Sequence, residues 1–381
     1  MENNNAVAIG FQALRSKDFG AARQSFETVL STGQETPEVW LGLAAACDGL
    51  NDRSAQKSAI ERALALDPRN IGALIAQGDW HDREGDIKTA GGFYGSALSV
   101  AAQSAQAPPE LTDGLQRAQA KCQHYATVYE NYLRKSLDPI ADEIAANTNG
   151  AFNRSLDIMF GKRQIFLQQP QKYYFPELPS IQFYDRKHFA WLETIESQTS
   201  TIKAELDALI AGAGEFTPYV QQKSDTPRTD HLDMFDNPDW SAFFLWKDGV
   251  AVPENAARCP ETMAVIEKAP LARIPGHSPS ILFSLLRPGS KIPPHTGLIN
   301  TRLIAHLPLI VPNDCGFRVG NETRSWKEGE AFVFDDTIQH EAWNNSAQNR
   351  YVLIFDVETP FMSAAEHNAV RNLFAAINDY A

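Results

Sequence analysis

Three histidines in the C-terminal half of the chain stand where short apolar runs meet turns. His295 follows a Pro-Pro pair, His340 follows the segment EAFVFDDTIQ, and His306 lies inside the apolar run TRLIAHLPLIV. Turns at strand ends often carry the functional side chains of β-sheet domains. Neutral imidazole is a good ligand for divalent iron. His295 and His340 are therefore predicted to converge on one metal ion.

Two arginines in the same region are placed to bind an anion. Side chains two apart on a strand share a face, so Arg302, Ile304 and His306 are expected to point to the same side. A buried arginine needs a partner, and no acidic residue within that strand offers one to Arg302. Arg350, which opens the run RYVLIFDV, is in the same situation. With His306 and Ser284, these arginines predict a pocket for a carboxylate, which guanidinium binds through paired hydrogen bonds.

A metal held by two histidines beside such a pocket is the plan of a 2-oxoglutarate-dependent iron oxygenase. Long segments of the chain also resemble the aspartyl/asparaginyl β-hydroxylase family over about residues 170–362. They are PELPSIQFYD, DWSAFFLWKDG, PPHTGLINTRLIAHLPLIVP, NETRSWKEGEAFVFDDTIQHEAWN and NRYVLIFDVETP. The resemblance implies a double-stranded β-helix, a jelly-roll barrel of the cupin type with flanking helices. It also implies hydroxylation of the β-carbon of an Asp or Asn side chain in a peptide or protein, using Fe(II), O2 and 2-oxoglutarate, which is converted to succinate.

The resemblance assigns roles to individual residues as well. The metal ligands would be His295 and His340, the 2-oxoglutarate-binding residues Ser284, His306 and Arg350, and the substrate-binding residue Arg302. Gly297 stands where related barrels carry a carboxylate ligand; the family shares this glycine, and water fills the position. Ile304 replaces a second arginine of the family's hydroxylases of epidermal-growth-factor-like domains, so the iron-proximal carboxylate would be held less well. Asp335 and Asp336 are expected to fix the turn backbone rather than bind metal.

The N-terminal part of the chain repeats itself with a period of 34 residues, which places Ala44 over Gly78 and Ala63 over Ala97. Small residues at these positions allow close contact between helices. The pattern resembles the tetratricopeptide repeat and covers about residues 5–104. Beyond it, short β-rich runs between turn residues predict an antiparallel sandwich or barrel. The predicted order is a helical repeat domain (1–107), a helical cap and connector (108–169) and a dioxygenase domain (170–381).

Composition excludes several classes of protein. A net charge of -13 argues against nucleic acid as a partner. The four cysteines form no CxxC pair, which favours a reducing compartment. The first residues, MENNNAVAIG, lack the features of a signal peptide, and no apolar run approaches the length of a membrane-spanning helix. The sequence therefore predicts a cytoplasmic protein.

Two alternatives to a peptide hydroxylase fit the same residues. Related barrels hydroxylate the fatty acyl chains of lipid A, although such enzymes tend to have membrane-associating segments that are not visible in this sequence. In the other alternative, the barrel no longer turns over and the repeats act as a scaffold, which the Ile304 departure favours. A peptide or protein substrate presented by the concave surface of the repeats is the leading hypothesis, because such surfaces commonly bind peptides.

Overall fold

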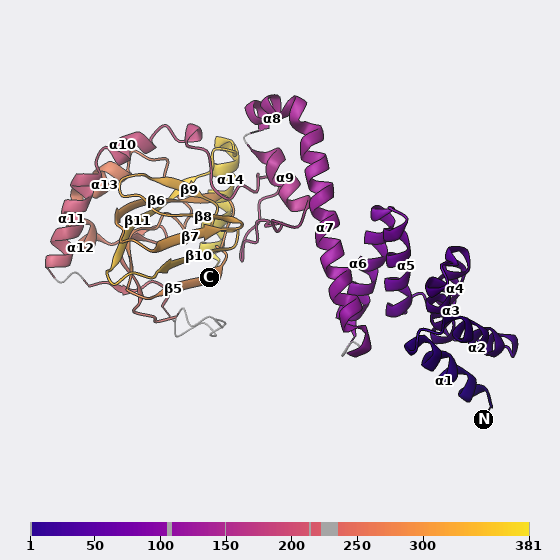
Figure 1. The fold of residues 1–381 in the computed structure, drawn as a ribbon. Helices are drawn as coiled ribbons and strands as arrows, with labels where there is room; N and C mark the ends of the chain where they lie inside the picture. The colour runs from indigo at the N-terminus through magenta and orange to yellow at the C-terminus, as the bar shows by residue number, and fades with distance from the viewer. Residues whose placement is uncertain (1, 105–108, 149, 213–214, 222–234, 381) are drawn as a thin grey trace. The chain divides into compact units, whose positions relative to one another are not determined.

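The structure is a computed structural model that describes residues 2–104, 109–148, 150–212, 215–221 and 235–380. The chain divides into two compact units, Met1–Phe160 and Gly161–Ala381 (Figure 1). The boundary falls inside the segment that the sequence assigns to a connector. The finer division into three domains stays a prediction.

The first unit is built from three consecutive helix pairs. They are α1 (Glu2–Arg15) with α2 (Phe19–Ser31), α3 (Pro37–Gly49) with α4 (Arg53–Leu66), and α5 (Ile71–Arg83) with α6 (Ile87–Gln103). The second helix of each pair begins after an aspartate whose side chain accepts a hydrogen bond from a backbone N–H of the first turn. These caps, Asp18, Asp52 and Asp86, recur every 34 residues. The predicted tetratricopeptide-like architecture is thus confirmed.

A long helix covers the last pair. This helix, α7 (Thr112–Leu137), packs against α6 and α5, as expected for the cap of a repeat array whose final apolar face needs a neighbour. It is followed by α8 (Ala141–Thr148) and α9 (Ala151–Met159), with short 3₁₀ turns at Pro109–Leu111 and Asp138–Ile140.

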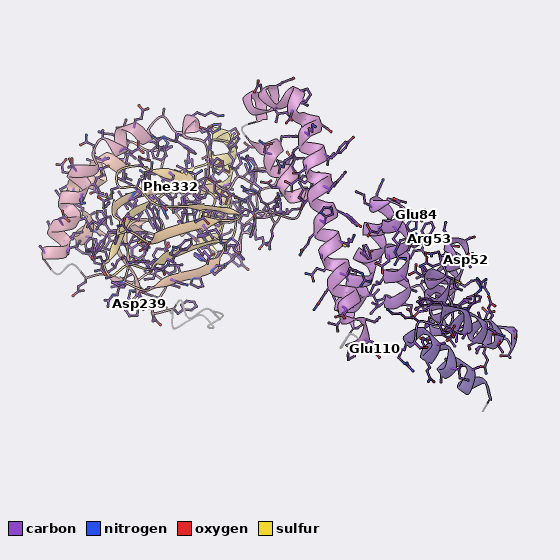
Figure 2. The ribbon with its side chains drawn as sticks, in the orientation of Figure 1. Asp52, Arg53, Glu84, Glu110, Asp239 and Phe332 are labelled. Atoms are coloured by element: carbon purple, nitrogen blue, oxygen red, sulfur yellow. The ribbon has the colours of Figure 1, made fainter. Side chains whose placement is uncertain are left out.

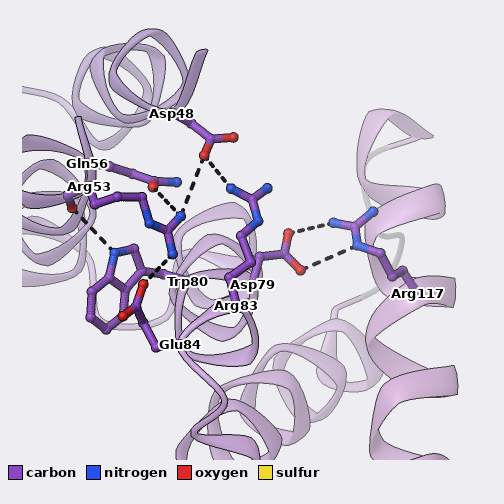
Figure 3. Close-up of polar contacts among 8 residues, drawn as sticks. All are labelled: Asp48, Arg53, Gln56, Asp79, Trp80, Arg83, Glu84 and Arg117. Atoms are coloured by element: carbon purple, nitrogen blue, oxygen red, sulfur yellow. Dashed lines mark hydrogen bonds and ion pairs between the residues drawn. The ribbon is translucent and has the colours of Figure 1, made fainter. Parts of the chain in front are cut away.

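Polar contacts join successive helices of this unit (Figure 3). Arg53 donates to Glu84 at 2.7 Å and to Gln56 at 3.1 Å. Arg117 of α7 pairs with Asp79 of α5 at 2.8 Å. Exposed ion pairs of this kind contribute at most about 1 kcal/mol each, so packing rather than charge determines the stability of the helix pairs.

That packing depends on glycines at the helix crossings. A Cβ at Gly78 would lie 2.6 Å from two ring atoms of Tyr94, which is fully buried and held by a hydrogen bond to Asp79 at 2.6 Å. Gly95, on the exposed side of α6, has nothing within 4 Å of the equivalent position. The two glycines therefore make a matched pair.

We expect Gly78→Ala to destabilise the protein by about 1–3 kcal/mol, because the added methyl group overpacks a site that cannot yield. Gly95→Ala is expected to stabilise it by about 0.5–1 kcal/mol through helix propensity alone. Urea unfolding followed by circular dichroism measures both changes. Equal effects of the two substitutions would contradict the close contact at Gly78.

The second unit contains two antiparallel sheets. The larger has the order β1-β2-β4-β11-β6-β9, with β3 paired to β2, and the smaller has the order β5-β10-β7-β8. The strands are β1 (Thr217–Pro218), β2 (Trp240–Lys247), β3 (Val250–Ala251), β4 (Ile281–Leu286), β5 (Lys291–His295), β6 (Arg302–Ile310), β7 (Cys315–Val319), β8 (Glu322–Arg324), β9 (Phe332–Phe334), β10 (His340–Asn344) and β11 (Arg350–Glu358). The predicted antiparallel β-sheet domain is therefore confirmed.

Helices accompany the larger sheet, as Figure 1 shows. They are α10 (Leu192–Glu196), α11 (Thr199–Ala211), α12 (Pro253–Ala256) and α13 (Pro260–Ile266). The last helix, α14 (Ala364–Asp379), packs instead in a separate core with Ile274, Ile299 and Met362. Alternate residues of β6 divide between two cores. Leu303, Ala305 and Leu307 pack with α10, α11 and α13. Ile304 instead joins a core that contains Phe317 of the smaller sheet.

This second core lies between the two sheets, and aromatic rings fill much of it. Phe332 of β9, labelled in Figure 2, packs on the ring of His306 with centroids 5.3 Å apart. The inward faces of β4, β6 and β11 also carry the polar side chains described next. Within the described segments, no helix has the length and apolar character needed to cross a membrane.

Candidate functional site

His295 and His340 lie directly opposite each other in the β5–β10 ladder. Their ring centroids are 4.1 Å apart. The Nδ1 of His295 lies 2.8 Å from the carbonyl oxygen of Pro293, and that of His340 lies 3.0 Å from the carbonyl oxygen of Ile338. A neutral ring that donates from Nδ1 keeps Nε2 as its free acceptor, the arrangement typical of metal-ligating histidines. The structure thus brings the two predicted ligands together, on strand termini.

Burial lowers the pKa of both imidazoles. For His340 the nearby His295 ring lowers the pKa further, and for both residues the backbone carbonyl partly opposes the shift. Both rings are therefore neutral at pH 7, which is the form that binds a metal ion. No cluster of three or more His, Cys, Asp or Glu side chains able to hold a metal occurs in the described part of the chain.

A buried guanidinium that has no acidic partner among the described residues lies in the same inter-sheet region. Arg350 is 1% exposed, its Nε has no hydrogen-bond partner, and its guanidinium carbon lies 4.8 Å from the centre of the Trp326 ring. Burial lowers the pKa of Arg350 to about 10, so the group remains cationic at pH 7. An unpaired buried cation is costly, and an anion bound there would offset the cost.

Ser284 lies on the strand next to Arg350 and faces the same side. In the β4–β11 register Ser284 is opposite Val352, two residues from Arg350, which makes the two side chains diagonal neighbours. The Ser284 hydroxyl is fully buried and also lacks a hydrogen-bond partner. Two donors without acceptors, side by side and buried, are suited to a carboxylate.

His306 of β6 lies close to Arg350, and both side chains contact Trp326. Burial lowers its pKa well below the usual value, and the Arg350 cation lowers it further. The Trp326 indole N–H donates to His306 Nδ1 at 3.4 Å, so the neutral ring carries its proton on Nε2 and can donate from it. Trp326 stands in a loop between strands, where nothing in the local sequence pattern indicates this contact.

Arg302, which has no acidic partner in its own strand, finds two in other parts of the chain. Its Nη1 lies 2.9 Å from Asp336 Oδ2, and its Nε lies 3.7 Å from Asp356 Oδ2. Asp356 belongs to β11 and accepts hydrogen bonds from the Ser278 hydroxyl at 2.7 Å and the Ser280 backbone N–H at 2.8 Å. Sequence reasoning missed both carboxylates, because only the strand pairing and the turn after β9 bring them near Arg302.

Gly297 is explained by the close approach of Asp336. A Cβ at residue 297 would lie 2.1 Å from Asp336 Oδ2, and the Gly297 N–H donates to the Asp336 carbonyl at 2.6 Å. The carboxylate of Asp336 therefore fills the space into which a longer side chain at 297 would extend. Asp335 does fix the turn as expected, accepting from the backbone N–H and hydroxyl of Thr337 at 2.9 and 2.6 Å. Asp336 pairs with Arg302 instead.

We expect Gly297→Ala to cost about 1–3 kcal/mol of folding free energy, because its methyl group must push the Asp336 carboxylate away from Arg302. The double variant Gly297→Ala, Asp336→Ala removes the clash and should therefore be less destabilised than the sum of the two single variants. A double-mutant cycle from urea unfolding measures this coupling. Additive effects would show that the two positions do not touch.

Fold and site together define a two-sheet domain in which a histidine pair and the buried guanidinium of Arg350 lie in one inter-sheet region. Residues 196–360 match the family model described as Aspartyl/Asparaginyl beta-hydroxylase. The family resemblance indicated by the sequence is thereby confirmed for this region.

Three curated relatives are each similar to part of this chain. "Ornithine lipid ester-linked acyl 2-hydroxylase" of Rhizobium tropici is 38% identical over 185 residues, covering 48% of this chain and 62% of that protein. "Aspartyl/asparaginyl beta-hydroxylase" of Mus musculus is 38% identical over 135 residues, covering 35% and 18%. "Aspartate beta-hydroxylase domain-containing protein 2" of Homo sapiens is 31% identical over 216 residues, covering 55% and 56%. The chain thus spans less than two thirds of each of these proteins.

The crystal structure of PcrH from Pseudomonas aeruginosa aligns with a TM-score of 0.30 and 20% identity, covering 32% of this chain and 90% of that one.

Proposed function

We propose that the second unit is an Fe(II)/2-oxoglutarate-dependent dioxygenase that hydroxylates the β-carbon of an Asp or Asn side chain in a peptide or protein. One observation carries the proposal. His295 and His340 oppose each other as neutral imidazoles, and the same inter-sheet core holds Arg350, which forms no ion pair with any described residue.

The donor set fits an iron(II) ion. His295 and His340 would hold it through their free Nε2 atoms, and neutral imidazole suits iron. Asp336 occupies the space beside Gly297, so the two imidazoles would be the protein ligands and other positions would be left for small molecules. When bound with 2-oxoglutarate and O2, the iron would supply the oxidising chemistry, while the chain binds, orients and excludes water.

Different side chains of the protein would then bind different parts of 2-oxoglutarate. Arg350 and the Ser284 hydroxyl would bind the distal carboxylate, which satisfies two donors that lack partners. His306, whose Nε2 carries the proton, would donate to the end of 2-oxoglutarate nearest the iron. Arg302 would face the substrate together with its partner Asp336.

The sheet arrangement supports the barrel implied by the resemblance. We propose a double-stranded β-helix of the jelly-roll, cupin type for the unit, which two antiparallel sheets that share a core support. The repeats would present a polypeptide to it. The cytoplasmic location is part of the same proposal, and it rests on four cysteines that are all unpaired.

An acyl-chain hydroxylase is the second candidate. It is favoured by the relative from Rhizobium tropici, whose name specifies acyl 2-hydroxylation.

Succinate formation tests the proposed function. Purified protein with iron(II), O2 and 2-oxoglutarate is assayed with Asp- or Asn-containing peptides and, separately, with an acyl lipid. We expect succinate well above the level of a His295→Ala control in the presence of a peptide. Stimulation of succinate formation by the lipid but not by the peptides would favour the acyl-chain hydroxylase. No succinate above the level of the control would leave the non-catalytic scaffold as the remaining hypothesis.

A further inference from the structure

We propose that Gln168 is a positioning residue for the metal site. Its side-chain amide bonds to both of the turns that border His295 and His340, and so fixes the distance between the two imidazoles. The inference rests on the proposed function, because it needs the metal ion that the two histidines would share. Gln168 lies outside residues 196–360, the part of the chain that matches the family model.

The chain segment around this glutamine runs along both turns. The backbone N–H of Gln169 donates to the carbonyl of Thr337 at 2.7 Å, in the turn before His340. The backbone N–H of Gln171 donates to the carbonyl of Gly297 at 3.1 Å, just after the other histidine. The segment therefore contacts, within a few residues, the two turns on which the geometry of the imidazole pair depends.

Both ends of the Gln168 amide are used. Its Nε2 donates to Asp335 Oδ2 at 2.6 Å, and its Oε1 accepts from Asn300 Nδ2 at 3.0 Å. Asp335 begins the turn before His340, and Asn300 lies in the loop after His295. Both partners are buried, so loss of either bond leaves a buried polar group short of a partner, which is costly. One amide thus connects the two turns.

The contact with Asp335 leads directly to one of the proposed ligands. Asp335 Oδ1 accepts from the backbone N–H and the hydroxyl of Thr337 at 2.9 and 2.6 Å, and the Asp335 carbonyl accepts from the Ile338 N–H at 3.3 Å. The Ile338 carbonyl in turn lies 3.0 Å from His340 Nδ1. The Asp335 carboxylate therefore needs one oxygen for its own turn and the other for Gln168.

The two turns also have a backbone connection. The Gly297 N–H donates to the Asp336 carbonyl at 2.6 Å, and no change of the Gln168 side chain removes this bond. Loss of the Gln168 amide is therefore expected to loosen the imidazole pair without separating it. Groups outside the ligand shell that orient metal-binding histidines change metal affinity by about 10–100-fold, and the lower end of this range is expected here.

Binding of cobalt(II) to the full chain, without 2-oxoglutarate, tests the proposal without turnover. Affinity is measured by competition with a chelator, and the visible absorption of the bound ion reports the arrangement of its ligands. We expect Gln168→Leu to weaken cobalt(II) binding by about tenfold. Gln164→Leu is a matched control, because this exposed residue of the same segment bonds to Asn321 through its backbone. It should bind cobalt(II) like the unmodified protein.

An exchange of amide and carboxylate provides a rescue. Asp335→Asn alone should also weaken binding by about tenfold, because an amide has only one oxygen and cannot accept from both Thr337 and Gln168. Adding Gln168→Glu restores the bond in the opposite direction, and the new carboxylate still accepts from Asn300. The exchange loses only the longer contact of Gln168 Nε2 with the Pro179 carbonyl, at 3.4 Å. The double variant should therefore recover the affinity to within about threefold and restore the absorption spectrum.

The outcomes distinguish this proposal from the proposed function. Unchanged cobalt(II) affinity in Gln168→Leu, even with a loss of stability in urea, would show a purely structural role and overturn the proposal. Equal weakening in Asp335→Asn and in the double variant would also overturn it, and this comparison decides alone if Gln168→Leu does not fold. Failure of the unmodified protein to bind cobalt(II) would instead overturn the metal site of the proposed function.

Discussion

Replacing Arg350 with methionine is expected to weaken the binding of 2-oxoglutarate to the metal-loaded protein by about a hundredfold or more, because truncating one partner of a buried charge pair costs about 2–5 kcal/mol. The substitution replaces the guanidinium with a long apolar side chain, and so removes the cation that the proposed function assigns to the distal carboxylate. Calorimetric titration of 2-oxoglutarate into the manganese-loaded protein measures the change.

The same substitution should not destabilise the ligand-free protein. Arg350 is buried, and burial lowers its pKa to about 10, which means that the surroundings disfavour the charged form. Methionine removes that cost, so urea unfolding of the ligand-free variant should show equal or greater stability. Arg324→Met is a control that should leave 2-oxoglutarate binding unchanged, because this half-buried arginine of β8 already pairs with Glu322. Unaltered affinity in Arg350→Met would contradict the proposed role.

The second large effect is expected at the imidazole pair. His340→Ala or His295→Ala should each weaken iron(II) binding by at least about a hundredfold, because changes in the outer shell of a metal site alone commonly cost up to about that much. With two protein ligands, each substitution leaves a single imidazole. Anaerobic titration of iron(II) against a competing chelator measures the affinity.

His277 provides a matched control. Its Nδ1 also lies near a carbonyl oxygen two residues back, that of Pro275 at 3.2 Å, and burial lowers its pKa as well. It belongs to a different part of the unit, against Phe374 of α14. We expect His277→Ala to bind iron(II) like the unmodified protein. Equal losses in the three variants would indicate general damage rather than a shared metal ion.

Much of this site could be predicted because strand periodicity is local. The alternation in β6 correctly placed Arg302, Ile304 and His306 on one face, toward the smaller sheet, and the opposite residues in the other core. The repeat helices could be predicted for a similar reason. Their spacing of 34 residues is a property of consecutive segments, and the same spacing recurs in the aspartate caps.

The partners of Arg302 could not be predicted, because they depend on contacts between distant parts of the chain. Asp356 lies near Arg302 because β6 pairs with β11, and Asp336 lies near it because of the turn after β9.

The boundaries of some helices could not be predicted from the sequence for a related reason. The local composition of RKHFAWLETIESQTSTIKAELDALIAGAG, which starts at Arg186, predicts one helix ending in glycines. The structure instead has a 3₁₀ turn at Arg186–His188, then α10 and α11. Arg186 instead bonds to Glu196 and to the carbonyl of Ala331, and such tertiary contacts override local propensity.

The central claim is that His295 and His340 hold one metal ion, and that the guanidinium of Arg350 binds the distal carboxylate of a 2-oxoglutarate molecule that chelates this ion. Visible absorption measured without oxygen tests it most directly, because 2-oxoglutarate that chelates iron(II) gives a charge-transfer band. We expect the band when both are added to the unmodified protein and to His277→Ala, no band in His340→Ala, and a band in Arg350→Met only at much higher 2-oxoglutarate concentration. Absence of the band in the unmodified protein, or an undiminished band in His340→Ala, would contradict the claim.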